Sequence, residues 1–172
     1  MTTTYDGRDS AAFLLDNVNR FVANLNVKGD CSISCSNSGG GILFPAYNYS
    51  RIIIKGESIE KSKLNIKGNG DYSIGINCPT LEFDNLSLEI NGGNGTSIDD
   101  YKGKQGGSGI YSSYITVNNV NLRVIGGSGG QGVNGGLSSY GIHCIQELSI
   151  TNSKCEIIGG SGGSANKGID VN

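Results

Sequence analysis

The sequence predicts an all-β protein, a single-stranded right-handed parallel β-helix closed at its N-terminal end by a short α-helix. Three observations predict this fold. Apolar residues alternate in short segments, these segments recur about every 27 to 34 residues, and glycine-rich runs separate them. The chain has 172 residues, with 29 glycines and 2 prolines. This length suffices for one continuous core, so we expect a single domain over residues 1–172.

An amphipathic helix is predicted over residues 10–24. Asp9 or Ser10 can serve as its N-cap, and the apolar residues that follow recur at the spacing of one helical face. Such a helix would cover the open end of the stack, which otherwise presents unpaired backbone groups and an apolar interior. The residues on the predicted apolar face are Leu14, Val18, Phe21, Val22 and Leu25.

The coils are predicted over residues 25–172. Each clear repeat opens with Gly-Ile, continues through two short alternating segments and ends in a glycine-rich run; the third copy aligns after one inserted residue. Alternation with a period of two is typical of a strand with one buried face. The clear repeats cover residues 75–108, 109–140 and 141–167, and a partial copy covers residues 168–172.

An asparagine separates the two segments of each clear repeat, at Asn85, Asn119 and Asn152. Asparagine tolerates the left-handed backbone conformation of a sharp bend, and its amide can bond the asparagine of the next coil. We therefore expect an interior asparagine ladder. The Gly-Gly-Ser-Gly runs are expected to form wide turns in which several glycines have a positive φ.

Two parts of the chain carry a family resemblance. Residues 6–13 (DGRDSAAF) are followed at residues 39–47 by Gly-Gly-Gly-Ile-Leu-Phe-Pro-Ala-Tyr. This pair resembles the capping helix and first coil of pectin-lyase-fold proteins and phage tailspikes. The later repeats resemble glycine-rich β-helical repeats in surface proteins of gut Firmicutes, often labelled carbohydrate-binding. The resemblance implies the β-helix fold, on which many different activities occur.

The outward columns of the repeats bear on catalysis. Lyases and hydrolases of the resembling fold stack acidic residues on adjacent coils, to hold calcium or to supply acid and base. Here Glu82 aligns with Thr116, whereas Glu89, Arg123 and Glu156 alternate in sign. We interpret the second column as a surface charge ladder. We therefore predict no catalytic residues, no enzymatic activity and no cofactor.

The loop from Asn94 to Gly107 contains the acidic pair Asp99-Asp100, followed by Tyr101. We interpret it as a solvated insertion, with a calcium or sugar contact as the alternative. Calcium-binding glycine repeats place an Asp after Gly-Gly-x-Gly-x, and no copy has one there, so no metal site is predicted. The single histidine aligns with a tyrosine of the neighbouring coil and is expected to be an ordinary surface residue.

The five cysteines are expected to be free thiols. Cys78 and Cys144 fall in one column two coils apart, roughly 9–10 Å, beyond the ~7 Å limit for a disulfide. Cys155 takes the place of a core leucine. Free thiols suit a reducing setting, and the first residues do not form a secretory leader. We therefore expect this chain inside the cell, or at the cell surface if it is a piece of a longer exported protein.

Four tyrosines gather near the Gly-Ile boundaries and the neighbouring loops, at Tyr101, Tyr111, Tyr114 and Tyr140. An exposed tyrosine can lie against the face of a sugar while its hydroxyl group forms hydrogen bonds. A glycan-binding face is one interpretation. The other is that these side chains only cover the backbone of the turns.

We predict a non-enzymatic binding or surface module that interacts with carbohydrate. The alternatives are a structural or protein-interaction protein, such as a phage or virion component or an inhibitor, and, with less support, a polysaccharide lyase or hydrolase. A net charge of −2 argues against nucleic acid as the main partner, and no apolar run approaches the ~20 residues of a membrane span. Expected partners are a glycan, a protein, or a second copy bound at the uncapped C-terminal coil.

Overall fold

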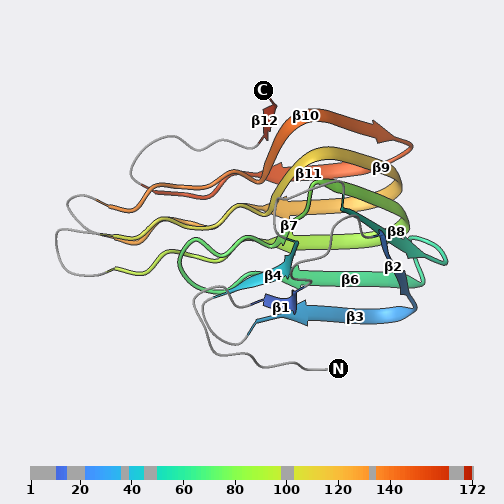
Figure 1. The fold of residues 1–172 in the computed structure, drawn as a ribbon, viewed down its shortest axis with the longest axis horizontal. Coiled ribbons are helices and arrows are strands. Elements are labelled where there is room, and N and C mark those ends of the chain that lie inside the picture. The colour runs from blue at the N-terminus through green and yellow to red at the C-terminus, as the bar shows by residue number, and fades with distance from the viewer. Residues whose placement is uncertain are drawn as a thin grey trace.

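The computed structural model describes residues 11–14, 22–35, 39–44, 50–97, 103–131, 135–162 and 169–171. These residues form a parallel β-solenoid of about four turns (Figure 1). The described strands join in one 12-stranded sheet that wraps around the core. The predicted all-β parallel fold is therefore confirmed.

The strands stack in three rows, and successive coils add one rung to each row. The first row holds β1 (Ala11–Leu14), β4 (Gly40–Leu43), β7 (Ile76–Asn77), the starts of β9 (Ile110–Ile125) and β10 (Ile142–Thr151), and β12 (Ile169–Val171). The second holds β2 (Val22–Val27), β5 (Arg51–Gly56), the start of β8 (Thr80–Asn91), the middle of β9 and the end of β10. The third holds β3 (Gly29–Ser34), β6 (Ser62–Lys67), the ends of β8 and β9, and β11 (Lys154–Ile158).

The core is built from columns of apolar side chains that repeat from coil to coil. Ile54, Phe83, Val117 and Ile150 lie in one such column, because their strands pair in parallel with these residues in register. The first three are at most 1% exposed, whereas Ile150 in the last coil is 39% exposed. The inserted residue predicted in the third repeat is also present, as a shift in register between Cys144 and Glu147.

The asparagine bend occurs where the sequence predicts it, but it is not interior. Asn85, Asn119 and Asn152 have φ values of 57°, 52° and 50°, which all lie in the left-handed region. Nδ2 of Asn119 donates to Oδ1 of Asn85 at 2.5 Å, whereas Nδ2 of Asn152 donates to Oδ1 of Asn118 at 3.3 Å. The first two residues are half-buried and the third is exposed. The ladder therefore links Asn85 and Asn119, which are only partly buried, and in the last coil Asn152 bonds Asn118 instead.

The predicted helix over residues 10–24 is wrong at both of its ends, where the chain is extended. Ala11–Leu14 form β1 and Val22–Val27 form β2, while residues 15–21 lie outside the described residues. In β2 the inward residues are Ala23, Leu25 and Val27, and the strand pairs with β5 over its whole length. The pairing with a neighbouring coil therefore outweighed the helical spacing of the apolar residues. The described part of the chain has no helix long and apolar enough to cross a membrane.

The glycine-rich runs project from the solenoid as extended arms, and the outgoing and returning parts of the chain lie side by side (Figure 1). The expected positive φ angles are wrong here: in the described part of these runs only Gly162 has one, at 156°. The glycines serve close approach instead, since a Cβ on Gly93 or Gly127 would overlap the backbone of a neighbouring arm. Hydrogen bonds between backbones link the arms in one continuous row. Its members are Ser73, Gly93, Gly107, Gly127, Ser139 and Gly160.

Candidate functional site

Three aromatic rings meet on the outer surface of the first row, near the C-terminal coils. The ring centroids of Tyr111 and His143 are 4.9 Å apart with an interplanar angle of 43°. Tyr140 meets His143 edge to face, also at 4.9 Å, with an angle of 87°. All three residues are half-buried, so each ring is in part open to solvent. We refer to Tyr111, Tyr140 and His143 as the aromatic cluster.

The repeat explains why these rings meet. His143 in β10 pairs in register with Tyr111 in β9, which in turn pairs with Asn77 in β7. Parallel pairing places such residues one above the other on the same side of the sheet. Tyr140 ends the returning glycine arm, and its carbonyl oxygen accepts a hydrogen bond from the backbone N–H of Gly109 at 3.1 Å. The cluster therefore depends on the register of two coils and on the path of one arm.

The other predicted site residues lie elsewhere. Tyr114 is 44% exposed, but it follows the next bend of β9 and pairs in register with Glu147. Asp99, Asp100 and Tyr101 lie outside the described residues. Of the three predicted tyrosines that the structure describes, it brings together Tyr111 and Tyr140, both against His143, and leaves Tyr114 apart. The residue that joins them, His143, was expected to be an ordinary surface residue, although its alignment with Tyr111 was the signal that could have identified it.

Outward acidic residues of the second and third rows are paired with cations from neighbouring coils. Arg123 lies between two of them, with Nη1 3.5 Å from Oε1 of Glu89 and Nε donating to Oε2 of Glu156 at 2.9 Å. Glu82 forms an ion pair with Arg51 and stands in register with Thr116. The predicted charge ladder is therefore confirmed, and the column of Ile53, Glu82 and Thr116 does not stack carboxylates.

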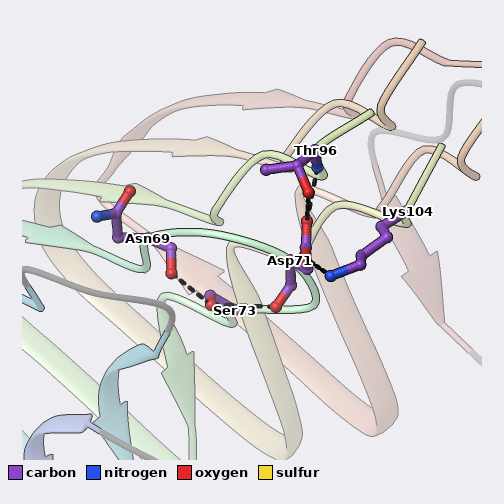
Figure 2. A network of polar contacts seen from close by, with 5 residues as sticks. All are labelled: Asn69, Asp71, Ser73, Thr96 and Lys104. Atoms are coloured by element: carbon purple, nitrogen blue, oxygen red, sulfur yellow. Dashed lines mark hydrogen bonds and ion pairs between the residues drawn. The ribbon is translucent and has the colours of Figure 1, made fainter. Parts of the chain in front are cut away.

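Asp71 is the centre of a polar network at the base of the glycine arms (Figure 2). Its Oδ1 accepts hydrogen bonds from the backbone N–H of Thr96 at 2.6 Å and from its hydroxyl group at 2.9 Å. Its Oδ2 lies 2.6 Å from Nζ of Lys104. Thr96 belongs to an outgoing arm and Lys104 to the arm that returns. Asp71 therefore links both arms to the turn before β7, a role that the sequence analysis did not predict.

The network shifts the protonation of Asp71. Burial by itself raises the pKa of this carboxyl group. The hydrogen bonds from Lys104 and Thr96 and the charge of Lys104 lower it, and together they outweigh burial, so the pKa lies below the ordinary value of 3.8. A carboxylate with a lowered pKa in the folded state stabilises the fold above the pKa of the unfolded chain. This stabilisation is lost as the pH falls through the lower, folded-state pKa.

We expect Asp71→Asn to lower the free energy of unfolding by about 1 kcal/mol at pH 7, because it removes a charge-assisted network that is partly open to solvent. The difference from wild type should shrink as the pH falls below about 4. Urea denaturation at pH 7 and near pH 3 measures both values. Asp30→Asn is the matched control, since the Asp30 side chain is 80% exposed. A wild-type advantage that stays the same at both pH values would contradict this role of Asp71.

The described cysteines are all free, as the sequence predicts. Cys78 and Cys144 lie in one column with Ser112 between them, and burial raises the pKa of the Cys78 thiol to about 11. Each member of this column has one hydrogen to donate and two acceptors within reach, a carbonyl farther along its own coil and a carbonyl of the preceding coil. The acceptors are Thr80 and Ser50 for Cys78, Tyr114 and Pro79 for Ser112, and Glu147 and Ser113 for Cys144. These thiols therefore stabilise the bend between two rows.

The described residues contain no group of three or more His, Cys, Asp or Glu side chains placed to hold a metal ion. The aromatic cluster is where two of the predicted site residues, Tyr111 and Tyr140, meet. No protein-family model, curated protein or solved structure matches the chain. The parallel β-solenoid is shown, and the resemblance to pectin-lyase-fold proteins and glycine-rich surface repeats stays a prediction.

Proposed function

We propose that this chain is a non-enzymatic carbohydrate-binding module, and that the glycan lies across the aromatic cluster. The observation that carries the proposal is the meeting of Tyr111, Tyr140 and His143 on one outward face, each in part open to solvent. The apolar faces of sugar rings pack against aromatic rings, while tyrosine hydroxyl groups form hydrogen bonds with sugar hydroxyls.

The surroundings of the cluster also suit a polar ligand. Asn77 lies below Tyr111 in the same column and is half-buried, so its amide group can both donate and accept hydrogen bonds beside the rings. The rigid register of three coils fixes these groups relative to one another, which lowers the entropy lost on binding. A ligand that follows the column would extend along the axis of the solenoid.

A polysaccharide-binding screen followed by titration calorimetry tests the proposal. We expect Tyr111→Ala and Tyr140→Ala each to weaken binding by about tenfold, or ~1.4 kcal/mol. His143→Ala should weaken it as well, because His143 holds both rings in place. Tyr114→Ala is the matched control, since it removes an exposed tyrosine of the same strand outside the cluster.

Circular dichroism and urea denaturation of each variant would verify that the solenoid remains folded. Loss of affinity in Tyr114→Ala but not in Tyr111→Ala would move the site to the neighbouring bend. A screen in which the wild-type protein binds no glycan would reject the carbohydrate proposal. Cleavage of a polymer during the screen would instead favour the lyase or hydrolase alternative.

A further inference from the structure

The third row of the described strands ends in β3 on one side and in β11 on the other. Among the described residues, β3 pairs only with β6, and β11 pairs only with β9. Figure 1 shows β3 and β11 on opposite sides of the stack. Each strand therefore presents a row of backbone N–H and C=O groups that another parallel strand can bind.

The two edge strands end the same columns with the same kinds of side chain. The column of Leu64, Leu88 and Leu122 ends in Cys31 on β3 and in Cys155 on β11. The next inward column ends in Ile33 and Ile157, and both of these residues are only partly buried against the core. An inward Cys-x-Ile pattern thus stands at both ends, so one end can continue the columns of the other.

The outward charges of the two edges are complementary. Asp30 and Lys154 are the two ends of one outward column, and both are exposed. Within the chain, Oδ1 of Asp30 already lies 3.9 Å from Nζ of Lys63 on the neighbouring strand. A copy stacked in the continuing register would bring Lys154 beside Asp30 in the same way. Glu156 would meet the neutral Ser32.

We propose that copies of this chain associate head to tail, with β11 of one copy paired in parallel with β3 of the next. The register places Lys154, Cys155 and Ile157 opposite Asp30, Cys31 and Ile33 of the next copy. The two edges differ and lie at opposite ends, so the contact is heterologous and forms open chains of copies rather than a closed dimer. This inference is argued from the third row and does not rest on the proposed glycan site.

The short strand β12 competes with this association. It lies on β10, in the place on the first row that β1 of the next copy would take once β3 seats on β11. β12 contributes three residues, Ile169–Val171, and β1 contributes four. Stacking therefore requires β12 to leave β10. We expect a chain that ends at Gly162 to associate more strongly than the full chain.

Oxidative cross-linking tests the register. Parallel strands place opposed Cα atoms about 4.8 Å apart, within the range that a disulfide spans. Diamide would take two electrons and two protons from Cys155 and from Cys31 of the next copy as the disulfide forms. Non-reducing gels of the full chain should show dimers, trimers and longer products that dithiothreitol removes, and the chain ending at Gly162 should give more of them. Peptide mapping should find Cys155 bonded to Cys31.

Single variants make the test specific. Cys31→Ser and Cys155→Ser should each abolish the products, whereas an equal mixture of the two should give dimers only, because each chain then retains one of the two thiols. Dimers from either variant alone would show a symmetric contact and overturn the proposal. The buried Cys35, Cys78 and Cys144 remain as internal controls.

Sedimentation velocity tests the contact without a covalent bond. We expect the full chain, and more strongly the chain ending at Gly162, to form larger species as the concentration rises. Lys154→Glu should shift both back toward monomer, because it places a like charge beside Asp30. Lys61→Glu makes the same change of charge in the turn before β6 and should leave association unchanged. Monomers at every concentration, with and without residues 163–172, would overturn the proposal.

Discussion

Phe83→Ala is expected to lower the free energy of unfolding by about 3–5 kcal/mol, which is a large part of the stability of a typical domain. Phe83 is 1% exposed and lies in a column between Ile54 and Val117. Truncation removes a large apolar side chain and leaves a cavity that the coils above and below cannot fill without losing their register. Urea denaturation followed by tyrosine fluorescence measures the change, since the chain has 8 tyrosines and 0 tryptophans.

Ile150→Ala is the matched control for Phe83→Ala, because Ile150 ends the same column and is 39% exposed. We expect it to cost no more than about 1 kcal/mol. Equal losses in the two variants would mean that the last coil is as well packed as the middle of the stack. The difference between them therefore measures how strongly stacking on both sides stabilises a coil.

Gly92→Ala is expected to destabilise the protein by about 3 kcal/mol, at the upper end of what overpacking costs. Gly92 follows β8 directly, and its N–H donates to the carbonyl oxygen of Ile125 at 2.9 Å. A Cβ at this position would overlap the carbonyl oxygen of Gly107 on the returning arm. The obstruction is backbone rather than a flexible side chain, so the arms would have to separate and lose their hydrogen bonds. The shift in the urea midpoint measures the effect.

Gly29→Asn is the control for Gly92→Ala. Gly29 has a φ of 68° and open space around the position of a Cβ. Asparagine accepts this backbone conformation, as Asn85 and Asn119 already do in this chain, so the cost should stay below about 1 kcal/mol. A larger loss at Gly29 than at Gly92 would show that backbone conformation, and not close approach, is what the glycines of this chain provide.

Most of the solenoid could be predicted from sequence because its period repeats in the core. The alternation of Leu81 and Phe83, and the recurrence of Asn85 at Asn119, indicate both the strands and their register. Near the N-terminus the same reasoning was misled at Val22 and Leu25. These two residues fit a helical face, yet they lie in a strand whose partner is 29 residues away, Val22 with Arg51. Pairing with the strand of the next coil determines the structure there, and this pairing is not visible in the local pattern of apolar residues.

The candidate site was predictable only in part, for a related reason. Tyr111 stands out as an aromatic residue at a repeat boundary, whereas His143 becomes informative only through its vertical neighbour. Asp71 was missed because its partners, Thr96 and Lys104, belong to arms whose packing follows no hydrophobic period. The sequence reports what recurs along the chain, and it says little about contacts made once.

The row of hydrogen bonds through Gly93, Gly107 and Gly127 gives this protein ordered structure that is neither helix nor strand. Its backbone groups are satisfied between arms, and the requirement on each glycine is only that it lack a side chain. The length of this row therefore depends on the number of coils, because each added coil brings one more pair of arms and leaves the existing hydrogen bonds intact. Duplication or deletion of whole repeats during evolution would therefore change the length of the surface formed by the arms in fixed steps, and no new kind of contact between arms would be needed.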